Sequence, residues 1–324
     1  MLAAIRRLGA AAGVDALACV GERAAITGQR PGGRISAGGT CRLLRAADGW
    51  MAVSLAREDD LDLLPAWLDG CRGNKSRNPR LIASANDWEA VAGAVEGRRA
   101  AEVVARGRLL GLPVAVLGER APAGLYRSER LGDAPPLTRP PRVVDLSSLW
   151  AGPLCSRILL QHGATVVKVE SATRPDGARR GTPAFFEALN AGKELVTVDF
   201  PSGELRHLLQ SADVVVEGSR PRALEQLGID AAAVVAGGPR LWLSITGHGR
   251  TGPQRDWVAF GDDAAVAGGL VEWHSGEPAF YGDAVADPLT GMAGAVAVTE
   301  ALASGGRWLV DCNLAGVAAH VAAA

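Results

Sequence analysis

Short apolar runs alternate with amphipathic stretches along the carboxyl-terminal part of the chain. The apolar runs predict strands, at 143–147, 165–170, 194–199, 213–217, 240–246 and 307–312. The stretches between them have apolar residues at helical spacing and predict helices, at 153–162, 203–211, 221–236, 258–270 and 290–303. Strands that alternate with helices in this way predict the α/β class, with a doubly wound, mainly parallel sheet and right-handed crossovers.

The first 135 residues have a different pattern. Two apolar runs on either side of Asp48-Gly49 predict a β-hairpin over 41–46 and 50–55, because Asp-Gly favours the tight turn of a hairpin. Helices are expected at 3–12, 17–26, around 58–67 and over 88–110, and a short strand at 113–116. The Pro-rich segment 134–141 then separates this part from the rest. We predict a smaller α+β domain over 1–135 and a Rossmann-like large domain over 136–324.

The segment 143–170 indicates where the large domain binds a ligand. It is a strand, a tight turn at Ala151-Gly152-Pro153, a helix that ends at His162-Gly163, and a second strand. A parallel strand pair joined by a helix leaves a crevice at the carboxyl end of the first strand, and the helix N-terminus there favours an anion. A nucleotide-bearing ligand is expected at this crevice.

Composition excludes several other classes of protein. Lys and Arg total 34 against 35 Asp and Glu, which leaves no excess positive charge for a nucleic acid or an anionic membrane surface. The chain has no long apolar run, and its first residues do not resemble a secretory signal. We therefore expect a cytoplasmic protein without a membrane segment. Its five cysteines have no disulfide or metal spacing and are expected to be reduced and mostly buried: Cys19, Cys41, Cys71, Cys155 and Cys312.

The histidines and glycines give no familiar cofactor motif. The five histidines have no zinc spacing, and no metal is expected. The segment Gly247–Gly252 matches G-x-G-x-x-G after a strand, but Pro253 delays the helix that a dinucleotide site requires. A glycine-rich turn that touches a ligand is favoured instead. No nucleophile elbow or P-loop is present, so a hydrolase triad and an NTPase are disfavoured.

Two groups of charged residues each have two interpretations. Asp287-Pro288 matches an N-cap followed by Pro at the first helical position, and a structural cap explains both residues. A carboxylate there is also held ionised by the helix dipole and is a usable nucleophile. Five basic residues after the first βαβ unit either bind phosphates or form an ordinary solvated face, which is the default: Lys168, Arg174, Arg179, Arg180 and Lys193.

With these residues in view, the carboxyl-terminal part resembles CoA-transferase family III, the CaiB/BaiF group. This group includes formyl-CoA and carnitine CoA-transferases and α-methylacyl-CoA racemase. The matching segments follow the family's order: the "AGP" turn at 151–153, "GA-V-KVE" at 163–170, "N-GK" at 190–193, "T-D" at 197–199, "ADV-VE" at 212–217, "RP--LE-LG" at 220–228, "PRL" at 239–241, "S-TG-G-TGP" at 244–253, "D---G" at 287–291 and "VD--L" at 310–314.

The resemblance implies an acyl-CoA:carboxylate CoA-transferase with coenzyme A, an acyl-CoA and a carboxylic acid as substrates. Asp287 takes the position of the catalytic Asp, which attacks the acyl-CoA thioester and then carries CoA as an aspartyl-CoA thioester. Nearby N–H groups would hold the developing oxyanion and a lowered pKa would keep Asp287 anionic. The CoA contacts that the resemblance implies are Ser148, Trp150, Ala151, Lys193, Gly218, Ser219, Arg220, Arg222 and Thr246. Family members form interlocked dimers, so a homodimer is expected.

The sequence also departs from the family. Residues 24–68 and 111–114 resemble its later, smaller domain, which here precedes the CoA-binding part, so the chain resembles a circularly permuted member or a piece of a tandem arrangement. We expect an ordinary member to continue beyond Ala324 into residues resembling 1–30. The racemase branch has a His near the segment that is Ala259–Asp262 here, where this chain has no histidine. The "ENFRPG" stretch that resembles 217–222 is EGSRPR here, without the usual Asn and aromatic residue. An acyl-CoA racemase or isomerase and a non-catalytic CoA-binding subunit are the alternatives.

Overall fold

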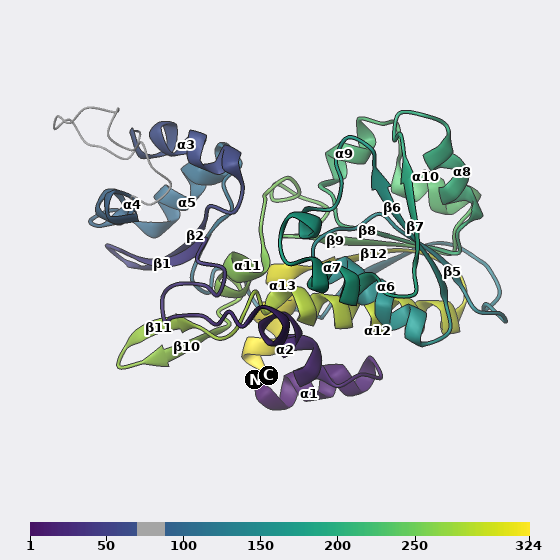
Figure 1. Cartoon of the computed structure of the whole chain (residues 1–324), viewed down its shortest axis with the longest axis horizontal. Coiled ribbons are helices and arrows are strands. Elements are labelled where there is room, and N and C mark those ends of the chain that lie inside the picture. The colour runs from purple at the N-terminus through teal and green to yellow at the C-terminus, as the bar shows by residue number, and fades with distance from the viewer. Residues whose placement is uncertain (70–87) are drawn as a thin grey trace.

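The computed structural model describes residues 1–69 and 88–324, and its largest feature is a seven-stranded sheet (Figure 1). All neighbouring strands are parallel except β4, which pairs antiparallel with β12 at one edge. The predicted α/β class with a mainly parallel, doubly wound sheet is confirmed. The spatial order is β4 (Arg127–Gly132), β12 (Arg307–Asn313), β9 (Leu241–Thr246), β8 (Val214–Glu217), β5 (Arg142–Asp145), β6 (Thr165–Ser171) and β7 (Glu194–Val198).

Helices cover both faces of this sheet, as Figure 1 shows. Alternate residues of one strand point to opposite faces, so Val143 of β5 packs into one core and Val144 into another. The first core lies under α6 (Ala151–Gln161), α12 (Ala286–Ser304) and α13 (Leu314–Ala323). The second lies under α8 (Glu204–Ser211), α9 (Pro221–Glu225) and α10 (Ala231–Gly237). A short 3-10 helix, η2 (Gly177–Arg180), and α7 (Pro183–Asn190) connect β6 to β7.

A smaller antiparallel sheet is formed by β1 (Cys41–Ala46), β2 (Gly49–Ser54) and β3 (Val114–Val116). The predicted hairpin is confirmed, with Ala46 paired to Gly49 across the turn. One face packs against α3 (Glu58–Asp69), α4 (Trp88–Val95) and α5 (Ala100–Leu109). The other packs against α11 (Gly261–Ala267) and the hairpin of β10 (Val271–His274) and β11 (Glu277–Phe280).

The first two helices, α1 (Leu2–Ala11) and α2 (Ala16–Thr27), lie beside the large sheet's helices. Ile5 and Leu8 of α1 and Cys19 of α2 belong to the same buried core as α6 and α12. Asp15 caps α2 by accepting hydrogen bonds from two backbone N–H groups, and Gly28 ends it with a positive φ of 72°. The division of the chain at residue 135 stays a prediction. In the structure α1 and α2, which precede that residue, pack against the helices of the large sheet.

Several elements differ from the predictions for local reasons. The single helix predicted over 88–110 is two helices, separated at Gly97 with its φ of 81°. The helix predicted over 221–236 is likewise two, with Gly228 between them at a φ of 67°. The sequence analysis missed β4, whose residues are mostly exposed and polar, and the β10–β11 hairpin with its Ser275-Gly276 turn. Four cysteines are free and buried as expected, and Cys71 lies outside the described residues.

Candidate active site

The carboxyl ends of β5 and β8 lie where the winding of the large sheet reverses. The chain passes from β5 through β6 to β7 on one side, and from β8 through β9 to β12 on the other. In sheets of this type the ligand crevice lies at such a reversal, beyond the carboxyl ends of the strands. The loops that follow are 146–150 and 218–220, and a Cβ on Gly218 would lie 3.5 Å from Cβ of Ser147. The two loops that carry most predicted CoA contacts therefore approach closely.

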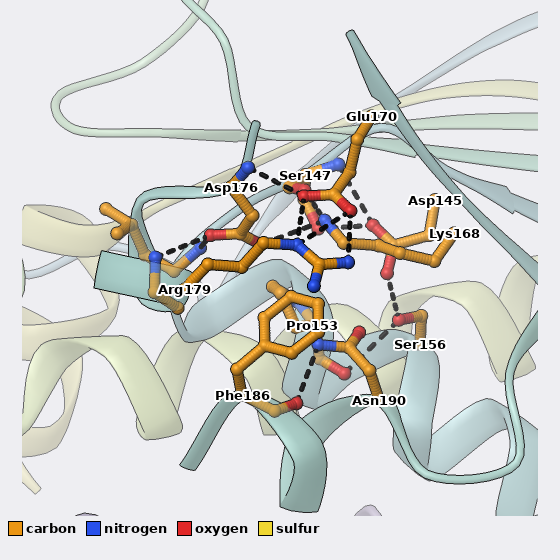
Figure 2. A network of polar contacts seen from close by, with 12 residues as sticks. Asp145, Ser147, Pro153, Ser156, Lys168, Glu170, Asp176, Arg179, Phe186 and Asn190 are labelled. Atoms are coloured by element: carbon orange, nitrogen blue, oxygen red, sulfur yellow. Dashed lines mark hydrogen bonds and ion pairs between the residues drawn. The ribbon is translucent and has the colours of Figure 1, made fainter. Parts of the chain in front are cut away.

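A buried carboxylate anchors the first of these loops. Asp145, the last residue of β5, accepts hydrogen bonds from the backbone N–H of Ser147 at 2.9 Å and from the hydroxyls of Ser147 and Ser156 (Figure 2). Its Oδ2 lies 3.3 Å from Nζ of Lys193. Burial by itself would raise the pKa of Asp145, but the charges of Lys193 and Lys168 outweigh it and lower that pKa. Asp145 is thus held as an anion beneath the turn.

A second ion pair fixes the tip of the same loop. Nζ of Lys168 donates to the carbonyl of Ser147 and lies 3.0 Å from Oδ2 of Asp176 (Figure 2). Oδ1 of Asp176 accepts the N–H of Leu149 at 2.9 Å. Leu149 has a φ of 69°, which a residue with a Cβ adopts only where its surroundings hold it. The Lys168–Asp176 pair therefore holds the loop in a strained form that exposes the backbone near Ser148.

Two of the five basic residues contradict the default of a solvated face. Both Lys168 and Lys193 are buried, because each has a carboxylate partner inside the protein. Lys193 also donates to the carbonyl of Pro153 at 2.9 Å and to Oδ1 of Asn190 at 3.0 Å, and burial lowers its pKa. Its ammonium group has no exposed surface in this conformation. Contact between Lys193 and CoA stays a prediction, and the structure shows that Lys193 supports the turn from within.

The remaining predicted contacts divide by exposure. Four face solvent wholly or in part near the two loops or at the start of α9, namely Ser148, Gly218, Ser219 and Arg220, and Arg222 is exposed 3.9 Å from Asp256. Three are buried, namely Trp150, Ala151 and Thr246. Thr246 ends β9 and accepts the N–H of Gly249, so the glycine-rich segment after it is a turn and not a dinucleotide motif. Contact of the exposed members with CoA stays a prediction.

Asp287 lies in the first turn of α12, but not at the cap. The N-cap is Val285, and the N–H of Asp287 donates to the carbonyl of Ala284 at 2.9 Å. The expectation of a lowered pKa is wrong: burial raises the pKa of Asp287 to about 7, and the charges of Asp262 and Asp283 add to this. The charge of Arg23 and a hydrogen bond from the N–H of Gly261 oppose the shift. Desolvation outweighs the helix dipole here because the carboxyl group is enclosed by protein.

The start of α11 forms the wall beside Asp287. A Cβ on Gly261 would lie 2.3 Å from Oδ2 of Asp287, so this close approach requires glycine. Asp262 accepts the N–H of Ala284 at 2.9 Å, and burial raises its pKa to about 6. This is the segment in which the racemase branch is expected to have a histidine. Here it presents a backbone N–H and carboxyl groups to Asp287.

Helix packing joins Asp287 to the "AGP" turn. Gly291 lies one turn after Asp287 on the same side of α12, and a Cβ there would be 2.7 Å from the carbonyl oxygen of Ala151. Gly152 is equally confined, since its Cβ would lie 2.1 Å from Cβ of Ser147. These small residues let α12, α6 and the β5 loop pack in close contact. The helix that carries Asp287 is thereby held against the start of α6, which follows the loop of the predicted CoA contacts.

Sequence reasoning missed the residues that surround Asp287 and brace the loop. Arg23 on α2 makes a bidentate ion pair with Asp283, with Nε 2.6 Å from Oδ2, although 260 positions separate them. No local pattern around Arg23 indicates this partner, because the contact depends on how α2 packs. Asp176 was also missed, although its position as the cap of η2 left a sequence trace in the pair Asp176-Gly177.

Comparison with known proteins identifies the family. The sequence model of CoA-transferase family III matches residues 141–324, more than half of the chain, and the chain belongs to this family. It is 32% identical over 194 residues to a succinate–glutarate CoA-transferase of Agrobacterium fabrum, covering 52% of this chain and 48% of that protein. It is 31% identical over 176 residues to a formyl-CoA:oxalate CoA-transferase of Rhodopseudomonas palustris, covering 50% and 41%.

Solved structures give the same result. A CAIB/BAIF family protein from Brucella suis matches with a TM-score of 0.51 at 32% identity, over 55% of this chain and 53% of that one. A hypothetical protein from Mycobacterium tuberculosis matches with a TM-score of 0.52 at 29% identity, over 59% and 58%. The chain spans about half the length, or less, of the curated relatives it matches.

Among residues 1–69 and 88–324, no helix is both long and apolar enough to cross a membrane. Within the same described ranges, no group of three or more His, Cys, Asp or Glu side chains is arranged to hold a metal ion.

Proposed function

We propose that this protein is an acyl-CoA:carboxylate CoA-transferase whose nucleophile is Asp287. The observation that supports this most directly is the contact of the Asp287 helix with the "AGP" turn, where Gly291 packs on the carbonyl of Ala151. This contact supports the proposal because it holds the helix that carries Asp287 against the first turn of α6, which follows the loop where a CoA thioester would bind. The relatives named above transfer CoA between carboxylic acids, which agrees with this chemistry.

The reaction proceeds through three covalent intermediates, namely a mixed anhydride with the donor, an aspartyl-CoA thioester and a mixed anhydride with the acceptor. An oxygen of the Asp287 carboxylate attacks the thioester carbonyl, the C–S bond breaks, and the CoA thiolate leaves a mixed anhydride behind. The thiolate then attacks the aspartyl carbonyl of the anhydride, releasing the donor carboxylate and forming an aspartyl-CoA thioester. The acceptor carboxylate repeats the sequence in reverse, so CoA leaves on the acceptor and Asp287 is regenerated.

The surroundings of Asp287 suit this chemistry. Enclosure by protein removes water that would otherwise stabilise the carboxylate, which makes the anion more reactive once formed. The N–H of Gly261 donates to the Asp287 carboxyl group, and it would stabilise the negative charge that develops on an Asp287 oxygen when the thiolate attacks the aspartyl carbonyl. Since the pKa of Asp287 is about 7, its reactive anionic fraction increases as the pH rises through neutrality.

Trapping of the covalent intermediate tests the proposal. The protein is incubated with succinyl-CoA or formyl-CoA, quenched with hydroxylamine, and digested for mass spectrometry. Hydroxylamine displaces CoA from an aspartyl thioester and leaves a hydroxamate, which we expect only on the peptide containing Asp287. Asp287→Asn should abolish the label, and Asp133→Asn, a change at an exposed carboxylate, should keep it.

Other outcomes identify the alternatives. Exchange of the α-proton of an acyl-CoA for deuterium without any acceptor and without the label would indicate a racemase or isomerase. CoA binding that is unchanged in Asp287→Ala, with no label across a broad acyl-CoA panel, would indicate a non-catalytic subunit. Either result overturns the transferase proposal.

A further inference from the structure

Arg23 of α2 lies between the two parts of the candidate active site. Its guanidinium forms the bidentate pair with Asp283 on one side. On the other side it stacks over the ring of Trp150, which begins the "AGP" turn, with Cζ 4.9 Å from the ring centroid. One cation from the start of the chain therefore contacts both the loop before Asp287 and the turn beside the crevice.

The loop that Arg23 contacts determines the position of Asp287. Asp283 is buried, and Ala284 after it has a φ of 43°, an unfavourable conformation for a residue with a Cβ. Ala284 donates its N–H to Asp262 and accepts the N–H of Asp287. A strained residue of this kind persists only where its neighbours fix it. Here Arg23 fixes Asp283 and Asp262 fixes Ala284.

The charges around Asp287 are unbalanced. Asp262 and Asp263 face it from α11 and Asp283 faces it from the preceding loop, while Arg23 faces it from α2. The negative charges of Asp262 and Asp283 disfavour the anionic form of Asp287, and the positive charge of Arg23 favours it. Removal of Arg23 and removal of Asp283 should therefore shift the ionisation of Asp287 in opposite directions.

We propose that Arg23 is a positioning residue for Asp287. Arg23 holds the loop before Asp287 through its ion pair with Asp283, and its positive charge keeps the Asp287 carboxylate available for reaction. Its meaning for catalysis rests on the proposed function. The position and ionisation of Asp287 are nevertheless properties of the folded protein and can be measured without any substrate.

A titration of the Asp287 carboxyl group tests this directly. The intact chain is labelled with [4-13C]aspartate, and the Asp287 resonance is assigned by its loss in Asp287→Asn. We expect Arg23→Gln to move the titration midpoint of Asp287 up, and Asp283→Asn to move it down, each by about one pH unit. A purely structural contact would not give shifts of opposite sign.

Three further variants separate charge from packing. Arg23→Lys keeps the charge without the bidentate geometry, so its midpoint should lie between those of Arg23→Gln and the unmodified protein. The double change of Arg23→Gln with Asp283→Asn leaves no unpaired buried charge, so it avoids the cost in folding free energy of such a charge. In this variant the titration midpoint of Asp287 should be close to that of the unmodified protein. Glu22→Gln is the matched control, because Glu22 is the neighbouring residue on α2 and pairs with Arg157 at 2.6 Å instead. It should leave the midpoint unchanged.

Each outcome either supports or overturns the proposal. If Arg23→Gln and Asp283→Asn shift the midpoint in the same direction, or if Glu22→Gln shifts it as much as Arg23→Gln, Arg23 does not act on Asp287 through its charge. If the titrations behave as expected but no label forms on Asp287 with acyl-CoA, the proposed function fails and the role of Arg23 stands. Where labelling does occur, the pH at which its rate is half-maximal should follow the titration midpoint in every variant.

Discussion

Asp287 lies in the first turn of α12, where the helix dipole favours an ionised carboxylate, yet its pKa is raised to about 7. The dipole contributes a partial charge over one turn, whereas burial among other carboxyl groups removes hydration and adds like charge. Local sequence shows the helix start but not the neighbouring carboxyl groups. The predicted helix start near Asp287 is confirmed, whereas the expected lowering of its pKa is wrong.

The raised pKa of this one residue predicts that the stability of the folded protein depends on pH. The folded protein binds a proton at Asp287 up to about pH 7, while an unfolded Asp releases it near pH 4. The stabilising contribution is therefore complete below the unfolded pKa and is lost as the pH rises through the folded pKa. Asp287→Asn, which cannot ionise, should raise the Tm relative to the unmodified protein at pH 8 by roughly 2 °C or more, and by less at pH 5.

Thermal unfolding followed by circular dichroism at both pH values measures this effect. Asp133→Asn serves as the control, since Asp133 is exposed and should give the same small change at pH 5 and pH 8. An equal change in Tm at both pH values for Asp287→Asn would contradict the raised pKa.

At the scale of elements, the close packing of α12 on α6 depends on small residues. Gly291 meets the backbone of Ala151, and Gly294 meets Sγ of Cys155 at a distance that leaves little room for a side chain. Such contacts bring helix axes together and fix how far the first turn of α12, with Asp287, lies from the first turn of α6, which is the "AGP" segment. The sequence shows these glycines inside a predicted helix, where they lower helix propensity. Only the packing explains their presence.

Gly291→Ala should therefore destabilise the protein, although alanine is the better helix former. The added Cβ would lie 2.7 Å from a carbonyl oxygen, and a shift of backbone is needed to admit it. We expect a loss of about 1–3 kcal/mol in the free energy of unfolding. Gly21→Ala in α2 is the matched control: no heavy atom lies within 4 Å of its added Cβ, so it should be neutral or stabilising by up to about 1 kcal/mol. Urea unfolding of the two variants compares them, and equal effects would contradict the packing argument.

At the scale of the whole molecule, segments far apart in the chain build one site. The α2 helix supplies Arg23, the β5 loop supplies the predicted CoA contacts, and α12 supplies Asp287. The family match begins only at residue 141, so Arg23 lies outside the matched part of the chain. The permuted order of the two halves stays a prediction, and in the structure early residues pack beside the last helices (Figure 1).

The homodimer stays a prediction of the family resemblance, and it has a simple measurement. Light scattering after size exclusion should give about twice the chain mass of 33.4 kDa across a tenfold range of concentration. Chemical crosslinking between differently tagged copies should join the smaller-domain region of one copy to the Asp287 region of the other. A mass of one chain at every concentration would contradict the prediction.

The sequence by itself determined the class of fold, the six parallel strands of the large sheet and the family, but not the antiparallel edge strand β4. It did so because strands buried on both faces are continuous apolar runs, and because the turns between them carry glycines and charges at fixed spacing. It also indicated Asp287 as the candidate nucleophile and the loops at 146–150 and 218–220 as candidate CoA contacts, and these stay predictions. The tertiary structure decided which charges meet. The buried positions of Lys168 and Lys193, the raised pKa of Asp287, and the pairing of Arg23 with Asp283 all depend on distant segments packing together, and electrostatic effects follow distance in space and exclusion of water, which local sequence does not specify.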